Sequence, residues 1–184
     1  MSESTQFDLQ PTLVGNTIKL RPLRPDDFDA LFAAASDSLI WEQHPDPLRY
    51  QKPAFERFFS GALESRGALV VLECGSGCVI GSSRYYDWDA RQREVAIGAT
   101  FLARSHWGGA TNGEMKALML EHAFRWAEVV WFHVGVSNWR SRRAMEKIGG
   151  IYSHEARKEL NGVAHDYVFF KIPAPHQPNT TISR

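Results

Sequence analysis

The stretch from Glu94 to Gly113 reads EVAIGATFLARSHWGGATNG, and the segment EMKALMLEHAFRWA follows it directly at 114–127. The first half of the stretch is apolar and β-branched, which is typical of a buried strand, and the apolar residues of the second segment recur at helical spacing. The loop between them is rich in small residues, namely Gly108, Gly109, Ala110 and Gly113. The sequence therefore predicts a strand, a loop of small residues and a helix.

A loop of this composition that opens into a helix suits an anion such as a diphosphate. The first N–H groups of a helix have no intrahelical partner and lie at the positive end of the helix dipole, and small residues let a phosphate approach the backbone closely. Thr111 to Glu114 also fits a capping box, with Thr111 as the N-cap and Glu114 reaching back. The alternative is a well-capped helix after a flexible loop that binds nothing.

The length and charge of the chain limit the classes of function. Its 184 residues suffice for one domain with a substantial core. With 21 basic and 21 acidic residues the formal net charge is zero, so no overall field favours nucleic acid or an anionic membrane. We expect a flexible N-terminus at 1–12, one domain at 13–172 and a flexible tail at 173–184, because the two ends are polar or rich in Pro, Asn and Thr.

The sequence predicts a cytoplasmic protein. No apolar run approaches the roughly 20 residues that cross a bilayer, and the polar start MSESTQFDLQ lacks the apolar segment of a signal peptide. The two cysteines, Cys74 and Cys78, flank a Gly-Ser-Gly turn and we expect them to be reduced. No zinc-ligand spacing accompanies them, and no metal is expected.

The remaining segments predict a mixed α/β (α+β) fold. Strand patterns cover 17–20, 68–73, 78–86, 93–103, 129–136, 151–160 and 163–172, and helical patterns begin near Phe28, Pro53, Glu114 and Asn138. Asn161-Gly162 is a strong hairpin signal between the last two strands. We expect a mostly antiparallel twisted sheet of about seven strands with about four helices. A Rossmann fold is disfavoured because no repeated βαβ units surround the glycine loop.

The last helix carries a second group of candidate site residues. It reads NWRSRRAMEKIGG from Asn138, and its inner face places Ser141 beside Met145 and Ile148. Asn138 is predicted to cap the helix and Gly149 to end it. Arg140, Arg142 and Arg143 lie in or near the first turn, where basic side chains oppose the helix dipole. Either a bound anion nearby or simple solvation accounts for them.

Three blocks in this order resemble the GNAT acetyltransferases. The blocks are GNTIKLRPLRPDD near the start, EVAIGATFLARSHWGGATNGEM in the middle and NWRSRRAMEKIGG late in the chain. The chain is most similar to the branch that includes the ribosomal-protein N-terminal acetyltransferases of RimJ/RimL type. The resemblance implies the GNAT acyl-CoA N-acyltransferase fold and transfer of an acetyl group from acetyl-CoA to a primary amine, either a small molecule or a protein N-terminus.

The resemblance also implies a cofactor site. The strand before the loop would contact the pantetheine arm through the main chain of Phe101, Leu102 and Ala103, and Arg143 would meet a phosphate. The pyrophosphate would lie on the loop formed by Trp107, Gly108, Gly109, Ala110, Thr111, Asn112 and Gly113. Asn138 and Ser141 match the Asn-x-x-Ser that lies near the sulfur. Relatives usually read Trp-Gly-Lys-Gly-Tyr-Ala-Thr-Glu-Ala here, so this chain lacks the loop lysine but keeps a backbone cradle.

Acyl transfer to an amine requires a base, a polarised carbonyl and stabilisation of the departing thiolate. We expect a strand N–H at or near Phe101 to polarise the carbonyl. Ser141 is the candidate proton donor to the thiolate, unless it only binds the cofactor or packs. Glu94 is the candidate base, unless it is an exposed carboxylate near Arg91 or Arg93. His44 and Asp87 are the rival bases.

An aromatic set is the candidate wall of the acceptor site, although each member could equally belong to the core. The predicted substrate-binding residues are Trp41, His44, Tyr85 and Tyr86, with Trp88 as a further candidate. Two other functions compete with the transferase. One is a non-catalytic sensor that binds a CoA ester, and the other is nucleic-acid binding through the arginines of the last helix. By the same resemblance we expect a possible homodimer formed through the terminal strands.

Overall fold

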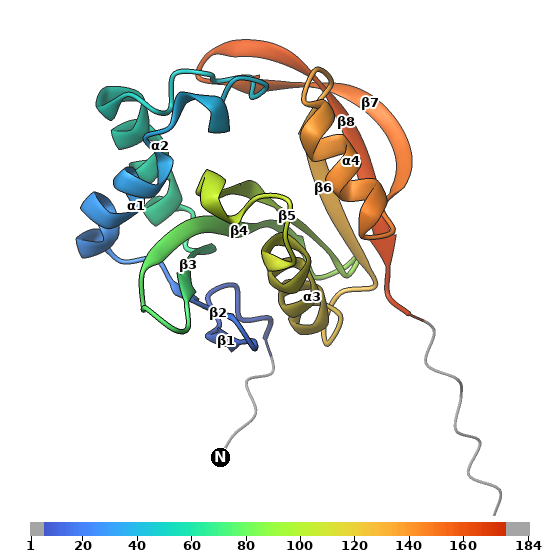
Figure 1. Ribbon diagram of the computed structural model, residues 1–184. Helices are drawn as coiled ribbons and strands as arrows, with labels where there is room; N and C mark the ends of the chain where they lie inside the picture. The colour runs from blue at the N-terminus through green and yellow to red at the C-terminus, as the bar shows by residue number, and fades with distance from the viewer. Residues whose placement is uncertain (1–5, 176–184) are drawn as a thin grey trace, which may run out of the picture.

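The computed structural model describes residues 6–175 and is built on one eight-stranded sheet (Figure 1). Its strands run in the order β1-β2-β3-β4-β5-β6-β8-β7. All neighbouring pairs are antiparallel except β5 and β6. The strands are β1 (Leu13–Val14), β2 (Ile18–Pro22), β3 (Ala68–Glu73), β4 (Val79–Asp89), β5 (Glu94–Leu102), β6 (Val129–Gly135), β7 (Ile151–Leu160) and β8 (Val163–Pro173).

Four α-helices cover the two faces of the sheet. They are α1 (Phe28–Ala35), α2 (Lys52–Glu64), α3 (Thr111–Ala123) and α4 (Trp139–Lys147). Figure 1 shows α1 and α2 together on one side, and α3 and α4 next to β6. Each face has its own core. On one face, α3 contributes Met115 and Met119. On the other, α2 contributes Phe55, Phe58 and Phe59.

The predicted fold class is confirmed, with one strand more than expected because the two-residue β1 joins the edge of the sheet. The C-terminal hairpin forms where the sequence places it. Asn161 and Gly162 have φ values of 53° and 77°, the left-handed conformation that a tight two-residue hairpin turn requires and that Asn and Gly tolerate.

The N-terminal segment is more ordered than the sequence suggests. Phe7 is 5% exposed and packs edge-on against Tyr85 and Trp88, and the side chain of Gln10 donates to the carbonyl of Ala68. Residues 6–12 therefore pack onto the domain. Of the predicted tail at 173–184, Pro173 ends β8 and the N–H of Ala174 donates to the carbonyl of Glu128. The rest of the two predicted flexible ends, at 1–5 and 176–184, lies outside the described residues.

The sheet opens between β5 and β6, its only parallel pair. The two strands are paired only at Glu94, Val95 and Ala96, opposite Val129 to Trp131, although β5 continues for six residues to Leu102. A bulge bends β5 within this unpaired part: its register against β4 shifts between Ser82 and Arg84, and Ala99 has a φ of 48°. The two strands diverge towards the loop that precedes α3.

Candidate functional site

The gap between β5 and β6 is bordered on one side by the end of β5. The N–H of Ala103 donates to the carbonyl of Ile80, 2.8 Å away, so by the alternation of antiparallel pairs Phe101 also turns its N–H towards β4 and Leu102 turns its own towards the gap. The Leu102 carbonyl accepts a bond from the indole of Trp107 at 2.9 Å. Trp107 therefore anchors the start of the loop to the end of β5.

The loop leaves open space above the start of α3. Gly108 has a φ of +74°, and a Cβ built on Gly108, Gly109 or Gly113 meets no atom within 4 Å. The helix begins at Thr111, with Ala110 as its N-cap. These positions leave the backbone open at the positive end of the helix, where an anion such as a diphosphate can approach it.

The predicted capping box is wrong. Neither Thr111 nor any other side chain caps α3, because the carboxylate of Glu114 instead accepts bonds from the backbone N–H groups of Asn16 and Thr17 and from the Thr17 hydroxyl. These bonds lower the pKa of Glu114, the Thr17 hydroxyl bond being the largest cause. Glu114 thus ties α3 to the segment before β2, and the N–H groups of the first turn remain available to a ligand.

The start of α4 lies across the gap. Asn138 caps this helix as predicted, with its side-chain oxygen 3.1 Å from the N–H of Ser141. Ser141 is half-buried, and its hydroxyl has no hydrogen-bond partner within residues 6–175. Arg143 is exposed on the same helix. The guanidinium of Arg140 stacks on the ring of Trp107 at 4.1 Å, so α4 and the glycine loop are in direct contact.

A lysine is buried on the α3 face of the gap. Lys116 is 2% exposed; its Nζ donates to the Thr100 hydroxyl of β5 at 2.8 Å and lies 5.4 Å from the ring of Phe132 in β6. No carboxylate of the described residues pairs with it. Burial lowers the pKa of Lys116 to about 7, so the amine is partly neutral at physiological pH.

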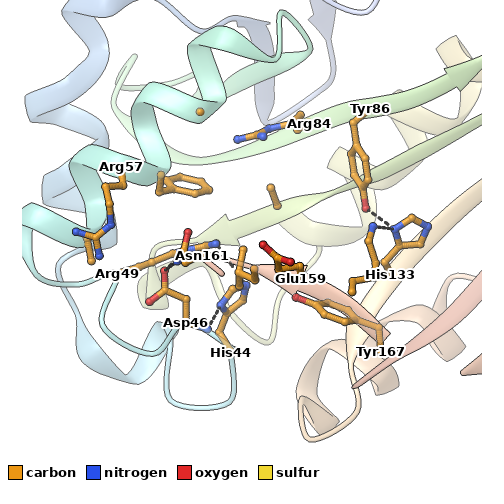
Figure 2. Close-up of a pocket in the computed structure, with 16 residues that line it drawn as sticks. His44, Asp46, Arg49, Arg57, Arg84, Tyr86, His133, Glu159, Asn161 and Tyr167 are labelled. Atoms are coloured by element: carbon orange, nitrogen blue, oxygen red, sulfur yellow. Dashed lines mark hydrogen bonds and ion pairs between the residues drawn. The ribbon is translucent and has the colours of Figure 1, made fainter. Parts of the chain in front are cut away.

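The opposite face of the sheet carries a pocket of about 320 Å³ (Figure 2). Its walls come from the segment before α2, from α2 itself, from β4, β5 and β6, and from the tip of the β7–β8 hairpin. The tip is held down by a 3.0 Å bond from Asn161 to the carboxylate of Asp46. Ala99 of β5 also lines the pocket, which therefore extends to the unpaired part of β5.

A hydrogen-bonded cluster lies on the β6 side of the pocket. The hydroxyl of Tyr86 and the Nζ of Lys158 approach Nδ1 of His133 at 3.1 and 2.7 Å. Figure 2 shows Tyr86 extending from its strand towards His133. Burial and the nearby Lys158 lower the pKa of His133 to about 3, and burial lowers the pKa of Lys158. His133 is therefore neutral and accepts hydrogen bonds at Nδ1.

The predicted acceptor residues separate into two groups. His44 and Tyr86 line the pocket. Trp41 is buried in the core with its indole bonded to the carbonyl of Ala35, and Tyr85 is buried on the opposite face with its hydroxyl bonded to the carbonyl of Met119. Neither of these two lines the pocket. Tyr85 is excluded because neighbouring strand residues such as Tyr85 and Tyr86 face opposite sides of a sheet.

The candidate bases lie at different places. His44 is in the pocket, and burial together with Arg49 lowers its pKa to about 3. Glu94 lies at the closed end of the gap, where its carboxylate accepts a bond from the indole of Trp131 at 2.9 Å. Asp87 is exposed and outside the pocket lining. The structure therefore does not bring Glu94 and Asp87 together with the pocket.

Sequence reasoning missed three polar residues of this region, namely Arg84, Lys116 and His133. Two of them interrupt an apolar pattern: His133 stands between buried Phe132 and Val134 in β6, and Lys116 lies on the inner face of α3 with Met119. Arg84 follows Ser82 and Ser83 and gave no such signal. A polar residue at a predicted core position was the available signal.

The sequence model of the acetyltransferase (GNAT) domain matches residues 17–151, most of the chain. The chain belongs to the GNAT acetyltransferase family. The resemblance seen in the sequence is thereby confirmed, and as a GNAT protein the chain is an acetyl-CoA-dependent N-acetyltransferase.

Solved structures of other GNAT proteins share the fold. A GCN5-related N-acetyltransferase from Brucella melitensis superposes with a TM-score of 0.76 at 21% identity, covering 90% of this chain and 79% of that one. A GNAT-family acetyltransferase from Bacillus anthracis gives 0.73 at 16% identity, with 89% and 99% covered. Mycobacterium smegmatis RimJ in complex with CoA-disulfide gives 0.68 at 20%, with 90% and 87% covered. No curated protein matches the sequence.

Neither a membrane-spanning helix nor a metal-binding cluster is found within residues 6–175. Within residues 6–175 no helix has the length and apolar character to cross a bilayer. The same part of the chain contains no group of three or more His, Cys, Asp and Glu side chains placed to hold a metal ion.

Proposed function

We propose that this GNAT protein binds acetyl-CoA in the gap between β5 and β6 and transfers the acetyl group to a primary amine in the pocket. The observation that carries the proposal is that the unpaired part of β5 belongs to both places. Ala99 lines the pocket and Leu102 carries the anchor of the glycine loop. A thioester lying along β5 would therefore face an amine bound on the other side of the strand.

We assign a group of this chain to each part of acetyl-CoA. The loop from Trp107 to Gly113 and the first turn of α3 suit the pyrophosphate, because their backbone is open and lies at a helix N-terminus. The edge of β5 at 101–103 suits the pantetheine. Asn138 is used as a helix cap, which leaves Ser141 as the side chain of α4 near the sulfur. We also assign Arg143, which is exposed on α4, to a phosphate of the cofactor.

The acceptor nitrogen attacks the thioester carbon, the carbon–sulfur bond breaks and the sulfur leaves with the bonding electrons. Phe101 turns its N–H towards β4, so we assign polarisation of the carbonyl oxygen to an N–H of β5 that faces the gap, such as that of Leu102. The Ser141 hydroxyl, which has no hydrogen-bond partner within residues 6–175, donates a proton to the thiolate. CoA then leaves as the thiol.

The acceptor must lose a proton before or during attack. We assign this step to the cluster of Tyr86, His133 and Lys158, because it borders the pocket and its hydrogen bonds form a path along which a proton can move. The Glu94 carboxylate is the alternative base and would act through a relay. Lys158→Met and Glu94→Gln separate the two: we expect the variant of the true base to lose most of kcat while its affinity for acetyl-CoA stays within a few-fold of wild type.

The acceptor is either a small amine or a protein N-terminus, and no nucleic-acid or membrane partner is proposed. A homodimer through the terminal strands is also part of the proposal. Strand β7 is an edge of the sheet, and Ile151 and Tyr152 on it are 51% and 56% exposed. Light scattering on the purified protein tests the dimer, which a monomeric mass at micromolar concentration would rule out.

Calorimetric titration with acetyl-CoA tests the cofactor site. We expect Gly109→Trp to abolish binding, because its side chain would fill the open space of the loop without requiring a positive φ. Gly75→Trp is the matched control, since Gly75 has equally open surroundings in the β3–β4 turn. Equal binding by both variants would refute the site.

A turnover assay with a panel of amines then separates the enzyme from the competing CoA-ester sensor. The sensor binds acetyl-CoA but acetylates none of the amines. For the transferase we expect Ser141→Ala to lower kcat while leaving acetyl-CoA affinity within a few-fold.

A further inference from the structure

The pocket is strongly basic for its size. Its lining includes four basic side chains, Arg49, Arg57, Arg84 and Lys158, and only two carboxylates, Asp46 and Glu159. One of these carboxylates is already engaged: Asp46 accepts bonds from Arg49 at 3.3 Å and from Asn161 at 3.0 Å. The lining therefore has an excess of positive charge that its own acidic groups do not balance.

Arg84 is the basic residue of the pocket lining whose side chain has neither a hydrogen bond nor an ion pair within residues 6–175. Its Nε is buried and has no hydrogen bond, the one such side-chain atom within residues 6–175, and the guanidinium joins none of the ion pairs found in that range. Its one ring contact is with Phe58, at 5.9 Å. A buried donor atom with no acceptor is costly. Arg84 as a whole is half-buried in strand β4, and its side chain lines the pocket.

A second guanidinium approaches the same ring. Arg49 lies 4.6 Å from the centroid of Phe58 and is 7% exposed. Burial, and then the charge of Arg49, lower the pKa of Arg84, which means that the two cations repel each other across a poorly solvated space. Figure 2 shows Arg49 and Arg84 on the same side of the pocket, away from His133. An anion bound there would supply the missing acceptor and offset the repulsion.

We propose that the acceptor is a small primary amine that also carries an anionic group, a carboxylate or a phosphate, held by Arg84 and Arg49. This inference rests on the proposed function, because it describes the second substrate of the same reaction. Guanidinium groups bind such anions through paired, charge-assisted hydrogen bonds. A pocket of about 320 Å³ is at the small end of ligand sites, which favours a molecule the size of an amino acid.

The two ends of such a molecule fit the two ends of the pocket. Arg84 and Tyr86 are two residues apart on one face of β4, a separation of about 7 Å along a strand. With the anion at Arg84, an amine about that far away lies beside the cluster of Tyr86 and His133, where β5 and β6 part. The acid group thus fixes the position of the molecule in the pocket, and this position presents its nitrogen to the thioester.

The test compares amines of the same carbon chain that carry or lack an anionic group. The probes are 4-aminobutyrate against 4-amino-1-butanol for the carboxylate, and O-phosphoethanolamine against ethanolamine for the phosphate. We expect kcat/KM for the acid of at least one pair to exceed that of its neutral partner by about 10- to 100-fold, the usual range for charge-assisted bonds. The pair that shows the larger ratio identifies the anion.

Arg84→Gln should remove this preference and Arg84→Lys should restore part of it. Arg125→Gln is the control, because Arg125 is exposed, pairs with Glu121 at 3.8 Å and lies outside the pocket lining. Acetyl-CoA titration of each variant verifies that the fold and the cofactor site survive. Protection against heat provides a second readout: the acid, and not its neutral partner, should raise the Tm of the wild type and not that of Arg84→Gln.

The outcomes separate the two proposals. Loss of acetyl-CoA binding and of all acetylation in the wild type refutes the proposed function itself. If acetyl-CoA binds but neutral amines are acetylated as well as acids, or neither acid raises the Tm or reacts, only the anionic acceptor is refuted. Acetylation of an acidic peptide N-terminus but of neither small acid also overturns the small-molecule assignment.

Discussion

Replacing Lys116 by Met should stabilise the protein. The lysine is fully buried between β5 and β6, and only the Thr100 hydroxyl and the ring of Phe132 face its ammonium group. Met has a similar length and no charge, so it can occupy the same space in the core. The expected gain comes from removing the cost of burying the charge.

The size of the gain follows from the pKa. Lys116 has a pKa of about 7 in the folded protein against 10.5 for the free side chain. At 1.36 kcal/mol per pKa unit, a shift of this size corresponds to about 4 kcal/mol at pH 7 and about 2 kcal/mol at pH 9. Loss of the bond to Thr100 offsets about 1 kcal/mol of this gain. We therefore expect Lys116→Met to be more stable by about 3 kcal/mol at pH 7.

The sign of the pH dependence is fixed by linkage. Between pH 7 and 10.5 the unfolded chain holds a proton on Lys116 that the folded protein has released, so the stability of the wild type rises with pH relative to the variant. The cost is present in full below pH 7 and disappears as the pH rises through 10.5. Urea unfolding at pH 7 and pH 9 should therefore give a difference between the two proteins that shrinks by about 2 kcal/mol.

The control is Lys19→Met, which replaces an exposed lysine of β2. We expect the unfolding free energy of this control to stay within about 0.5 kcal/mol of wild type at both pH values. The reasoning is refuted if Lys116→Met is less stable than wild type at pH 7, or if its advantage is the same at pH 9.

Three further substitutions test other parts of the structure. Asn138→Ala removes the cap of α4 and should cost about 1 kcal/mol of unfolding free energy in urea; an unchanged midpoint would contradict the capping role. Burial opposes ionisation of Asp27, but bonds from Arg21 lower its pKa overall, so its contribution is present above the unfolded pKa and lost as the pH falls through the folded one. Asp27→Asn should then be less stable than wild type at pH 6 and close to it at pH 2 by circular dichroism. Trp107→Phe loses the bond to the Leu102 carbonyl and should weaken acetyl-CoA binding about tenfold in calorimetry, whereas equal affinity would show that the loop does not need this anchor.

The periodic spacing of apolar residues predicted most of the strands and helices. The pattern of β5, the loop and α3 was predictable because local spacing alone determines which face of each element is apolar. The hairpin at Asn161-Gly162 was predictable because only a few residue types accept a positive φ.

The predicted capping box does not form, and the reason cannot be read from the local sequence. Thr111 and Glu114 have the required spacing, but the Glu114 carboxylate finds Thr17, 97 residues away in sequence, and bonds to its N–H and hydroxyl. A competing partner of this kind becomes visible only when β2 and α3 are packed together.

The pocket proposed for the acceptor was the least predictable part. The alternation of side chains in a strand does state that Tyr85 and Tyr86 cannot both line one pocket, but which of the two faces the pocket depends on how helices cover the sheet. Arg84 and His133 come from strands separated by β5, so their common pocket depends on the order of strands, which the sequence alone does not specify.

Arg140 gives the molecule a property that neither site has alone. Its guanidinium stacks on Trp107 at the glycine loop and donates to the carbonyl of Ile40, 2.7 Å away, in the segment that leads to His44 of the pocket. One side chain thus contacts both the glycine loop and the segment that leads to the pocket. For the two substrates proposed above we expect thermodynamic coupling through Arg140: if one ligand changes the affinity for the other, the second changes the affinity for the first by the same factor.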